Sequence, residues 1–179
     1  MLQYKNLISN EICRELFSGF IRRQVVTKCW RRESGAWVIK DAPFIDDWTE
    51  KDYELLVSCL QHTADTGGLV RAAFLDNTLK AFVSVESRPF GSRKQYLDLS
   101  SIHVSADLRG EGVGAKLFHA ASDWARTQGA EKLYISAHSA VESQAFYKKM
   151  GCVEAKEYAS WHVEAEPFDC QLEYILPDF

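Results

Sequence analysis

Residues 109–114 read RGEGVG, and this run follows a strand-like apolar stretch and opens a stretch with helical spacing. Glycines let the backbone approach a ligand closely and adopt conformations that other residues avoid. Successive backbone N–H groups at the start of a helix, together with the helix dipole, bind anions. Arg109 adds a positive charge with bidentate phosphate geometry. The run therefore predicts a pyrophosphate-binding turn between a strand and a helix.

Two common nucleotide-binding motifs do not fit this turn. A Walker loop ends in Gly-Lys-Ser/Thr, whereas Gly114 is followed by Ala115 and Lys116. A dinucleotide-binding turn needs GxGxxG and an acidic residue about twenty positions later. The third glycine is out of place, and the next strand runs into Ala137 and His138 without a carboxylate. Both motifs are excluded.

The spacing of apolar residues places the turn within a mixed α/β domain. Thr49 and Asp52 predict a capping box at the start of a helix, and Asp76-Asn77-Thr78 predicts a hairpin turn. Helices are expected over 10–21, 49–66, 110–128 and 140–150, and strands over 36–40, 69–75, 79–86, 95–104, 132–137, 151–157 and 168–176. The order is antiparallel strands first, then β-α-β-α-β.

The turn and a second run together resemble the GCN5-related N-acetyltransferase (GNAT) superfamily. The family's phosphate motif, Q/R-x-x-G-x-G/A, matches Arg109 to Gly114 at every defined position. Its aromatic-Tyr-x-Lys-x-Gly run matches FYKKMG at residues 146–151. The resemblance covers about 69–157 and implies the GNAT fold, a central mixed, mostly antiparallel sheet flanked by helices. It implies one domain over 1–179, with acceptor-side helices in 1–66, the acetyl-CoA-binding core in 69–157 and a C-terminal strand in 158–179.

The resemblance also implies which residues bind acetyl-CoA. The backbone of Ile102, His103 and Val104 would pair with the pantetheine arm. The pyrophosphate would lie against Arg109, Gly110, Glu111, Gly112, Val113 and Gly114. Ala140 stands where many family members place an asparagine that contacts the cofactor. Ser139 and Ser143 are the candidates to replace that contact, unless the contact is missing.

The same resemblance implies Tyr147 as the general acid that protonates the departing thiolate, a role that fits the charge developing on sulfur. Asp98, on the strand before the motif, is the first choice for the general base that deprotonates the incoming amine. The competing interpretations are a strand-surface carboxylate for Asp98 and a core aromatic for Tyr147. Neither motif contains a nucleophilic cysteine, so we expect direct transfer in a ternary complex.

The chain is therefore expected to be an N-acetyltransferase that moves the acetyl group of acetyl-CoA to a primary amine of a small molecule or a peptide. The alternative is a non-catalytic acyl-CoA-binding or sensing module on the same fold. Residues 22–32 carry basic charges and residues 41–54 mainly acidic ones. These are either two solvated faces that attract each other, or the acidic run, with Asp46 and Asp47, faces the cleft and attracts a cationic amine.

The composition of the chain bears on its general class, its location and its need for a metal. The 179 residues are 46% apolar and carry a formal net charge of −4, which favours a globular core and disfavours nucleic-acid binding. No apolar run approaches the ~18 residues of a membrane span, and the N-terminus does not look like a secretory signal, so a cytoplasmic location is expected. Five scattered cysteines and five scattered histidines lack metal-ligand spacing, so no metal is expected. Exposed strands near the C-terminus would allow the chain to form a homodimer.

Overall fold

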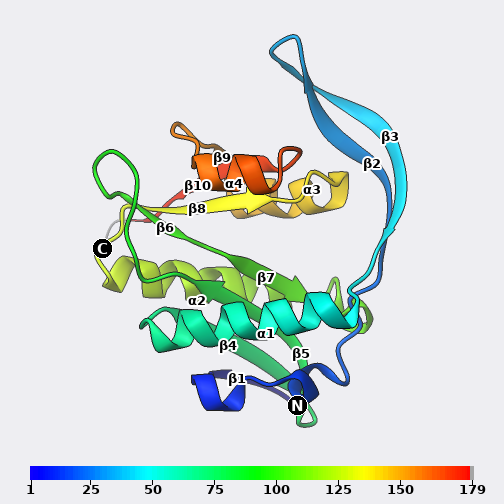
Figure 1. Cartoon of the computed structure of the whole chain (residues 1–179), viewed down its shortest axis with the longest axis vertical. Helices are drawn as coiled ribbons and strands as arrows, with labels where there is room; N and C mark the ends of the chain where they lie inside the picture. Colours follow the sequence, from blue (N-terminus) through cyan, green and yellow to red (C-terminus); the bar gives the residue numbers. More distant parts are fainter. Residues whose placement is uncertain (178–179) are drawn as a thin grey trace.

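A computed structural model describes residues 1–177 and contains two main sheets (Figure 1). The first has the order β1-β4-β5-β7 and is antiparallel throughout. Its strands are β1 (Leu2–Asn6), β4 (Leu69–Leu75), β5 (Thr78–Val85) and β7 (Ser101–Val104). The second has the order β6-β8-β10-β9, with β6 (Tyr96–Asp98), β8 (Lys132–Ala137), β9 (Val153–Glu154) and β10 (Cys170–Ile175). This mixed α/β arrangement is the predicted fold class.

The chain passes from one sheet to the other between Leu99 and Ser100. The Leu99 N–H donates to the Tyr134 carbonyl of β8 at 2.9 Å, whereas the Ser100 N–H donates to the Ser84 carbonyl of β5 at 3.0 Å. As a result β6 pairs in parallel with β8, and β7 pairs with β5 alone. The predicted single strand over 95–104 is therefore two strands, and beyond Leu99 the neighbouring strands β7 and β8 diverge.

Four α-helices cover the two faces of these sheets in the described chain. The helix α2 (Val113–Thr127) buries Leu117 and Phe118 against β5, β6 and β8, and α3 (Val141–Met150) packs on the same core. The opposite face carries α1 (Glu50–Asp65), which buries Tyr53 and Leu60, and α4 (Ser160–Ala165). None of the helices among residues 1–177 has the length and apolar character needed to cross a membrane.

The start of α1 confirms the predicted capping box. The Thr49 hydroxyl oxygen accepts a hydrogen bond from the Asp52 N–H at 3.3 Å, and Asp52 accepts one from the Thr49 N–H at 2.7 Å. Such reciprocal bonds satisfy two backbone donors that a helix start otherwise leaves free. The hairpin over 69–86, the strand over 132–137, the helix that the glycine turn opens and the helix that carries the FYKKMG run also agree with the prediction.

The helix predicted over 10–21 is wrong. The segment contains two 3₁₀ turns, Ser9–Glu11 and Arg14–Phe17, because the backbone is extended at Ile12 (φ −96°, ψ 105°) and at Cys13 (φ −142°, ψ 171°). Most of its apolar residues are nevertheless buried or partly buried, with Ile12 and Phe17 packed beneath α1 and β5. The spacing of the apolar residues thus reflects their burial in an irregular segment and does not indicate an α-helix.

A long hairpin replaces the short strand predicted over 36–40. It joins β2 (Gln24–Glu33) to β3 (Ala36–Asp46) through Ser34 and Gly35, both with positive φ (49° and 81°), as a two-residue hairpin turn requires. In Figure 1 this ribbon projects beside both sheets. The strand predicted over 151–157 shrinks to β9, and α4 is an element that was not predicted. Residues 1–66 hold β1, two 3₁₀ turns, this hairpin and one α-helix, and their role on the acceptor side stays a prediction.

Candidate active site

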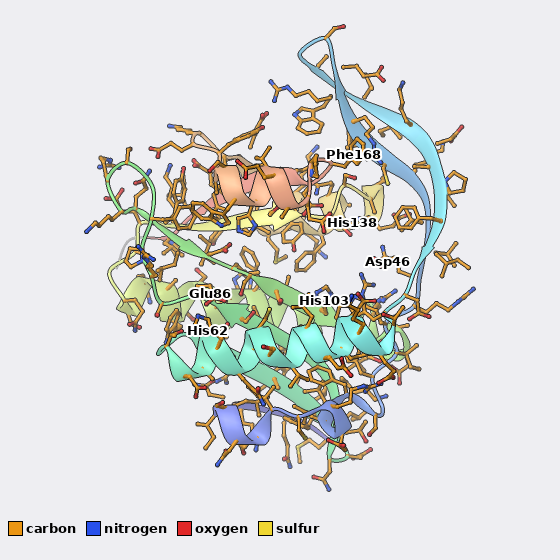
Figure 2. All side chains as sticks on the ribbon, in the orientation of Figure 1. Asp46, His62, Glu86, His103, His138 and Phe168 are labelled. Carbon is orange, nitrogen blue, oxygen red and sulfur yellow. The ribbon has the colours of Figure 1, made fainter. Side chains whose placement is uncertain are left out.

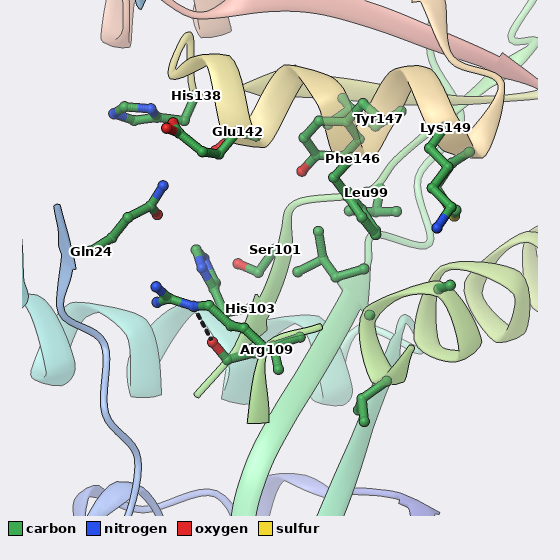
Figure 3. Close-up of a pocket in the computed structure, with 18 of the residues that line it drawn as sticks. Gln24, Leu99, Ser101, His103, Arg109, His138, Glu142, Phe146, Tyr147 and Lys149 are labelled. Atoms are coloured by element: carbon green, nitrogen blue, oxygen red, sulfur yellow. Dashed lines mark hydrogen bonds between the residues drawn. The ribbon is translucent and has the colours of Figure 1, made fainter. Parts of the chain in front are cut away.

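A cavity of about 880 Å³ lies where β7 and β8 diverge. Figure 3 shows Tyr147 and Phe146 reaching from α3 toward the space that Ser101, His103 and Arg109 border from the other side. The walls come from β7, the loop before α2, α3 and the segment that leads into β2. Lining residues predicted from the sequence are Ile102, His103, Val104, Arg109, Gly110, Gly112, Val113, Gly114, Ser143 and Tyr147.

The glycine loop leaves open space above the N-terminus of α2. Gly110 and Gly112 have φ values of +87° and +76°, and a Cβ built on either would meet no atom within 4 Å. The first N–H groups of a helix have no intrahelical acceptor, so those of α2 are available to an anion. Gly114 packs differently, since a Cβ there would lie 3.4 Å from both Val104 and Phe146. These residues fit a pyrophosphate, whereas Glu111 is exposed and does not line the cavity.

The guanidinium of Arg109 binds backbone carbonyls. It donates to the carbonyls of Val104 (3.2 Å), Arg23 (3.2 Å) and Arg22 (3.0 Å). Arg109 therefore ties the glycine loop to β7 and to the base of the β2–β3 hairpin. Arg23 and Lys149 line the same cavity and bring further positive charge to it. Sequence reasoning assigned the phosphate contact to Arg109 and missed both of these residues.

His103 lies between the cavity and the aromatic core under α1. Its ring is 4.8 Å from the Trp48 ring and 5.5 Å from the Phe82 ring, measured between centroids. Burial, helped by the positive charge of Arg22, lowers the pKa of His103 to about 3. The imidazole is thus neutral at physiological pH. The side chains of its neighbours in β7, Ile102 and Val104, pack toward α2 on the other face.

The acidic run of residues 41–54 does not reach the cavity wall. Asp46 forms an ion pair with Arg22, whose side chain is 9% exposed and also lies over the Trp48 ring. Neither Asp46 nor Asp47 lines the cavity. In Figure 2, Asp46 and His103 lie near the first sheet, and His138 and Phe168 lie near the second. The pairing favours the interpretation in which the basic and acidic segments neutralise each other.

Tyr147, the predicted general acid, lies in the cavity wall. It is half-buried on α3, with its ring 5.2 Å from that of Phe146, and it lines the cavity. Burial raises the pKa of the Tyr147 hydroxyl above its ordinary value, so the group stays protonated. A protonated hydroxyl is the state in which it could donate a proton to a leaving group.

Asp98 lies apart from this group. It is buried on β6 beneath α4, and its carboxylate accepts a hydrogen bond from His162 Nε2 at 2.8 Å. Burial alone would lower the pKa of His162, but the hydrogen bond and negative charge of Asp98 outweigh it and raise that pKa. Asp98 does not line the cavity. The structure therefore does not bring Asp98 together with Tyr147 and the glycine loop.

The two serines that were candidates for a cofactor contact also differ in their position relative to the cavity. Ser143 lines the cavity, whereas Ser139 does not. The Ser139 hydroxyl accepts a hydrogen bond from Arg31 at 2.7 Å, and its carbonyl accepts one from the Trp30 N–H at 2.8 Å. Ser139 thus connects the β2–β3 hairpin to the end of β8.

Several other cavity residues were not predicted as site residues. They lie on the segment that leads into β2, at the end of β8, on α3 and between α4 and β10. They are Arg22, Arg23, Gln24, Ser136, His138, Glu142, Lys149, Glu166 and Asp169. Placement after the end of β8 could have indicated His138, and Lys149 stands at the lysine position of the FYKKMG run.

Comparisons with known proteins agree with this fold. The chain resembles the crystal structure of nourseothricin acetyltransferase with a TM-score of 0.71 and 16% identity, over 98% of this chain and 99% of that one. A putative streptothricin acetyltransferase from Bacillus anthracis, solved with acetyl coenzyme A, gives 0.70 and 15%, over 99% of both chains. An N-acetyltransferase from Thermoplasma acidophilum, solved with coenzyme A, gives 0.58 and 13%, over 98% of this chain and 99% of that one.

Among curated proteins, none matches the chain by sequence. The model of the acetyltransferase (GNAT) family matches residues 27–152, which is more than half of the chain and includes both sequence motifs. The protein is therefore an acyltransferase that belongs to the GNAT acetyltransferase family.

Proposed function

We propose that the protein is an N-acetyltransferase that moves the acetyl group of acetyl-CoA directly to a primary amine. One observation carries the proposal: a single cavity joins the open glycine loop at the N-terminus of α2, the edge of β7 and the hydroxyl-bearing Tyr147. A cofactor with a pyrophosphate at one end and a thioester at the other needs these three features in one continuous space.

The chain offers each part of acetyl-CoA a matching group. Within the described sheets β7 pairs with β5 along one edge only, so its other edge can bond the amides of a pantetheine arm. The loop from Gly110 to Gly114 would hold the pyrophosphate through its N–H groups. Arg23 and Lys149 would help to neutralise the phosphate charges, and Ser143 would supply a hydroxyl for a hydrogen bond to the cofactor.

Direct transfer is the mechanism that these residues support. The amine nitrogen would bond to the acetyl carbon while Tyr147 donates its proton to the departing sulfur. Cysteine does not occur in the described lining of the cavity, and burial raises the pKa of both Cys152 and Cys170 to about 12. These two groups therefore stay thiols at neutral pH, which disfavours a covalent acetyl-cysteine. Positioning both reactants in one cavity supplies much of the rate.

The acceptor that we favour is a small cationic amine. Glu142, Glu166 and Asp169 line the cavity, and carboxylates on low-dielectric walls concentrate cations. Three similar folds are named after antibiotic acceptors, namely nourseothricin, streptothricin and aminoglycosides. These compounds, together with a simple polyamine, form the first panel to test.

The decisive experiment compares two glycines at opposite ends of α2. Gly112→Asp should abolish acetyl-CoA binding in calorimetry, because a carboxylate would repel the pyrophosphate. Gly129→Asp is the matched control, since Gly129 has a similar φ (+81°) and an equally open Cβ position but does not line the cavity. Thiol release with the amine panel then tests transfer. Equal binding by both variants would contradict the proposal, and tight binding without thiol release would favour a sensing module.

A further inference from the structure

Asp169 is a carboxylate in the cavity lining, where the predicted base Asp98 is absent. It directly precedes β10 and lines the cavity together with Ser136 and Tyr147. Ser136 lies at the end of β8, near the point where β7 turns away. A carboxylate here borders the same space as the proposed acid, on the face of the sheets that carries α4.

A chain of hydrogen bonds through the second sheet ends at this carboxylate. The Ala159 N–H donates to the Tyr134 oxygen at 2.9 Å, and the Tyr134 hydroxyl donates to Gln171 Oε1 at 2.5 Å. Gln171 Nε2 then donates to the Ser136 oxygen at 3.0 Å, and the Ser136 hydroxyl donates to Asp169 Oδ2 at 3.1 Å. Tyr134 and Gln171 are at most 2% exposed, so water does not compete with the bond between them.

The orientation of the Gln171 amide sets the direction of the chain. The amide oxygen faces the Tyr134 hydroxyl, which also accepts from the Ala159 N–H, and the amide nitrogen faces Ser136. The one proton of Ser136 is left for Asp169. The network therefore presents a donor to Asp169, which favours the ionised carboxylate and fixes one of its two oxygens.

We propose that Asp169 is the general base that deprotonates the acceptor amine, and that Ser136, Gln171 and Tyr134 position it. This inference rests on the proposed N-acetyltransferase function and replaces Asp98 in that role. Asp98 is bonded to His162 and lies outside the cavity lining. Asp169 has one oxygen held by Ser136 and the other available to a ligand in the cavity.

The step balances without a further reactant. The ammonium form of the acceptor gives one proton to Asp169 Oδ1 and becomes a neutral amine. Its nitrogen lone pair bonds to the acetyl carbon, the carbon–sulfur bond breaks, and the sulfur takes the Tyr147 proton. The second nitrogen proton returns to the Tyr147 oxygen through water, and Asp169 releases its proton to solvent. The products are the acetamide, free coenzyme A and one proton.

The charges around Asp169 suit a base that must accept and release a proton. Burial raises the pKa of Asp169, and the nearby negative charge of Glu166 adds to that effect. The Ser136 hydrogen bond and the imidazoles of His138 and His162 act in the opposite direction, and the net pKa is above its ordinary value. Tyr147, from α3, faces the same carboxylate. A raised pKa makes the Asp169 carboxylate a stronger base.

The first test compares two nucleophiles on one variant. With an amine from the panel that the wild type acetylates, Asp169→Asn should lower kcat by about 10²–10⁴-fold, the usual range for a general base. With hydroxylamine, which is already unprotonated at neutral pH, the same variant should retain most of the wild-type rate. The asparagine oxygen can still accept from Ser136, so the fold should persist, and unchanged acetyl-CoA affinity in calorimetry would verify it.

A matched variant serves as the control. Asp98→Asn removes the carboxylate predicted from the sequence, and it should keep kcat within about threefold of the wild type, well below the range for a base. Equal losses of Asp169→Asn with both nucleophiles, no loss with either, or a larger loss in Asp98→Asn would overturn the inference. A wild type that acetylates no amine would instead overturn the proposed function, and the inference with it.

The role of the positioning residues is tested by the pKa of Asp169, a quantity that a general loss of stability would not shift. Ser136→Ala removes the bond that lowers the pKa of Asp169, so the acid limb of the kcat/KM profile should shift to higher pH. A titration of carbon-13-labelled aspartate followed by NMR should show the same shift in the free protein. Ser136→Thr keeps a hydroxyl and should restore the wild-type profile. An unchanged acid limb and an unchanged titration in Ser136→Ala would remove Ser136 from the assignment.

Discussion

The guanidinium of Arg31 in β2 donates to the Ser139 hydroxyl at the end of β8, 2.7 Å away, and joins segments 108 residues apart. The same guanidinium lies 4.5 Å from the centre of the Phe168 ring. The neighbouring Trp30 N–H bonds the Ser139 carbonyl. The β2–β3 hairpin thus begins at the first sheet, beside Arg109, and is fastened at the second sheet, beside the cavity.

This contact predicts that Ser139 supports the hairpin instead of binding cofactor. Ser139→Ala should lower the free energy of unfolding by about 1–2 kcal/mol, because the hydrogen bond involves a charged, half-buried donor. Its acetyl-CoA affinity should stay within about twofold of the wild type. Ser143→Ala, in the cavity wall, should show the reverse pattern. A denaturant titration and calorimetry measure the two quantities, and a strong loss of affinity in Ser139→Ala would restore it as a cofactor contact.

Features encoded within a few residues were predictable from the sequence. The capping box of Thr49 and Asp52 and the RGEGVG turn each need only local geometry, and both form as expected. The β2–β3 hairpin was missed because its burial is sparse: of the ten residues of β2, Val26 and Cys29 are buried. The arrangement at Asp169 depends on pairing between β8 and β10, which no local pattern records.

Arg109 and Arg23 should differ in what they contribute. Arg109→Lys loses most of three bonds to carbonyls, since an ammonium cannot reproduce the planar fork. We expect a loss of about 1–2 kcal/mol in the free energy of unfolding, together with weaker acetyl-CoA binding. Arg23→Ala should weaken binding, more so at low salt, and leave stability nearly unchanged. Thermal melts and calorimetry at two salt concentrations would check both. Equal stability of the two variants would contradict the structural role of Arg109.

Replacing Asp46 should lower the free energy of unfolding more than replacing Asp47. Asp46→Ala leaves the buried Arg22 without its ionic partner, and breaking such a pair costs about 3 kcal/mol. Asp47 is exposed, so Asp47→Ala should cost less than about 1 kcal/mol. Urea unfolding measures the difference. If Asp47→Lys sharply raised the KM for a cationic acceptor at unchanged stability, the acidic run would have to face the acceptor after all.

His103 should make the folded state sensitive to acid. Its pKa is about 3 in the folded protein, because of burial and the nearby charge of Arg22, against about 6.5 when unfolded. Between these values the unfolded chain binds more protons, so stability falls as the pH drops from 6.5 toward 3. From pH 7 to pH 5 this one group accounts for about 2 kcal/mol. His103→Gln removes the titration, so the variant should lose less stability than the wild type over that interval. Urea unfolding at both pH values measures the loss, and equal losses in the two proteins would mean that His103 titrates normally within the fold.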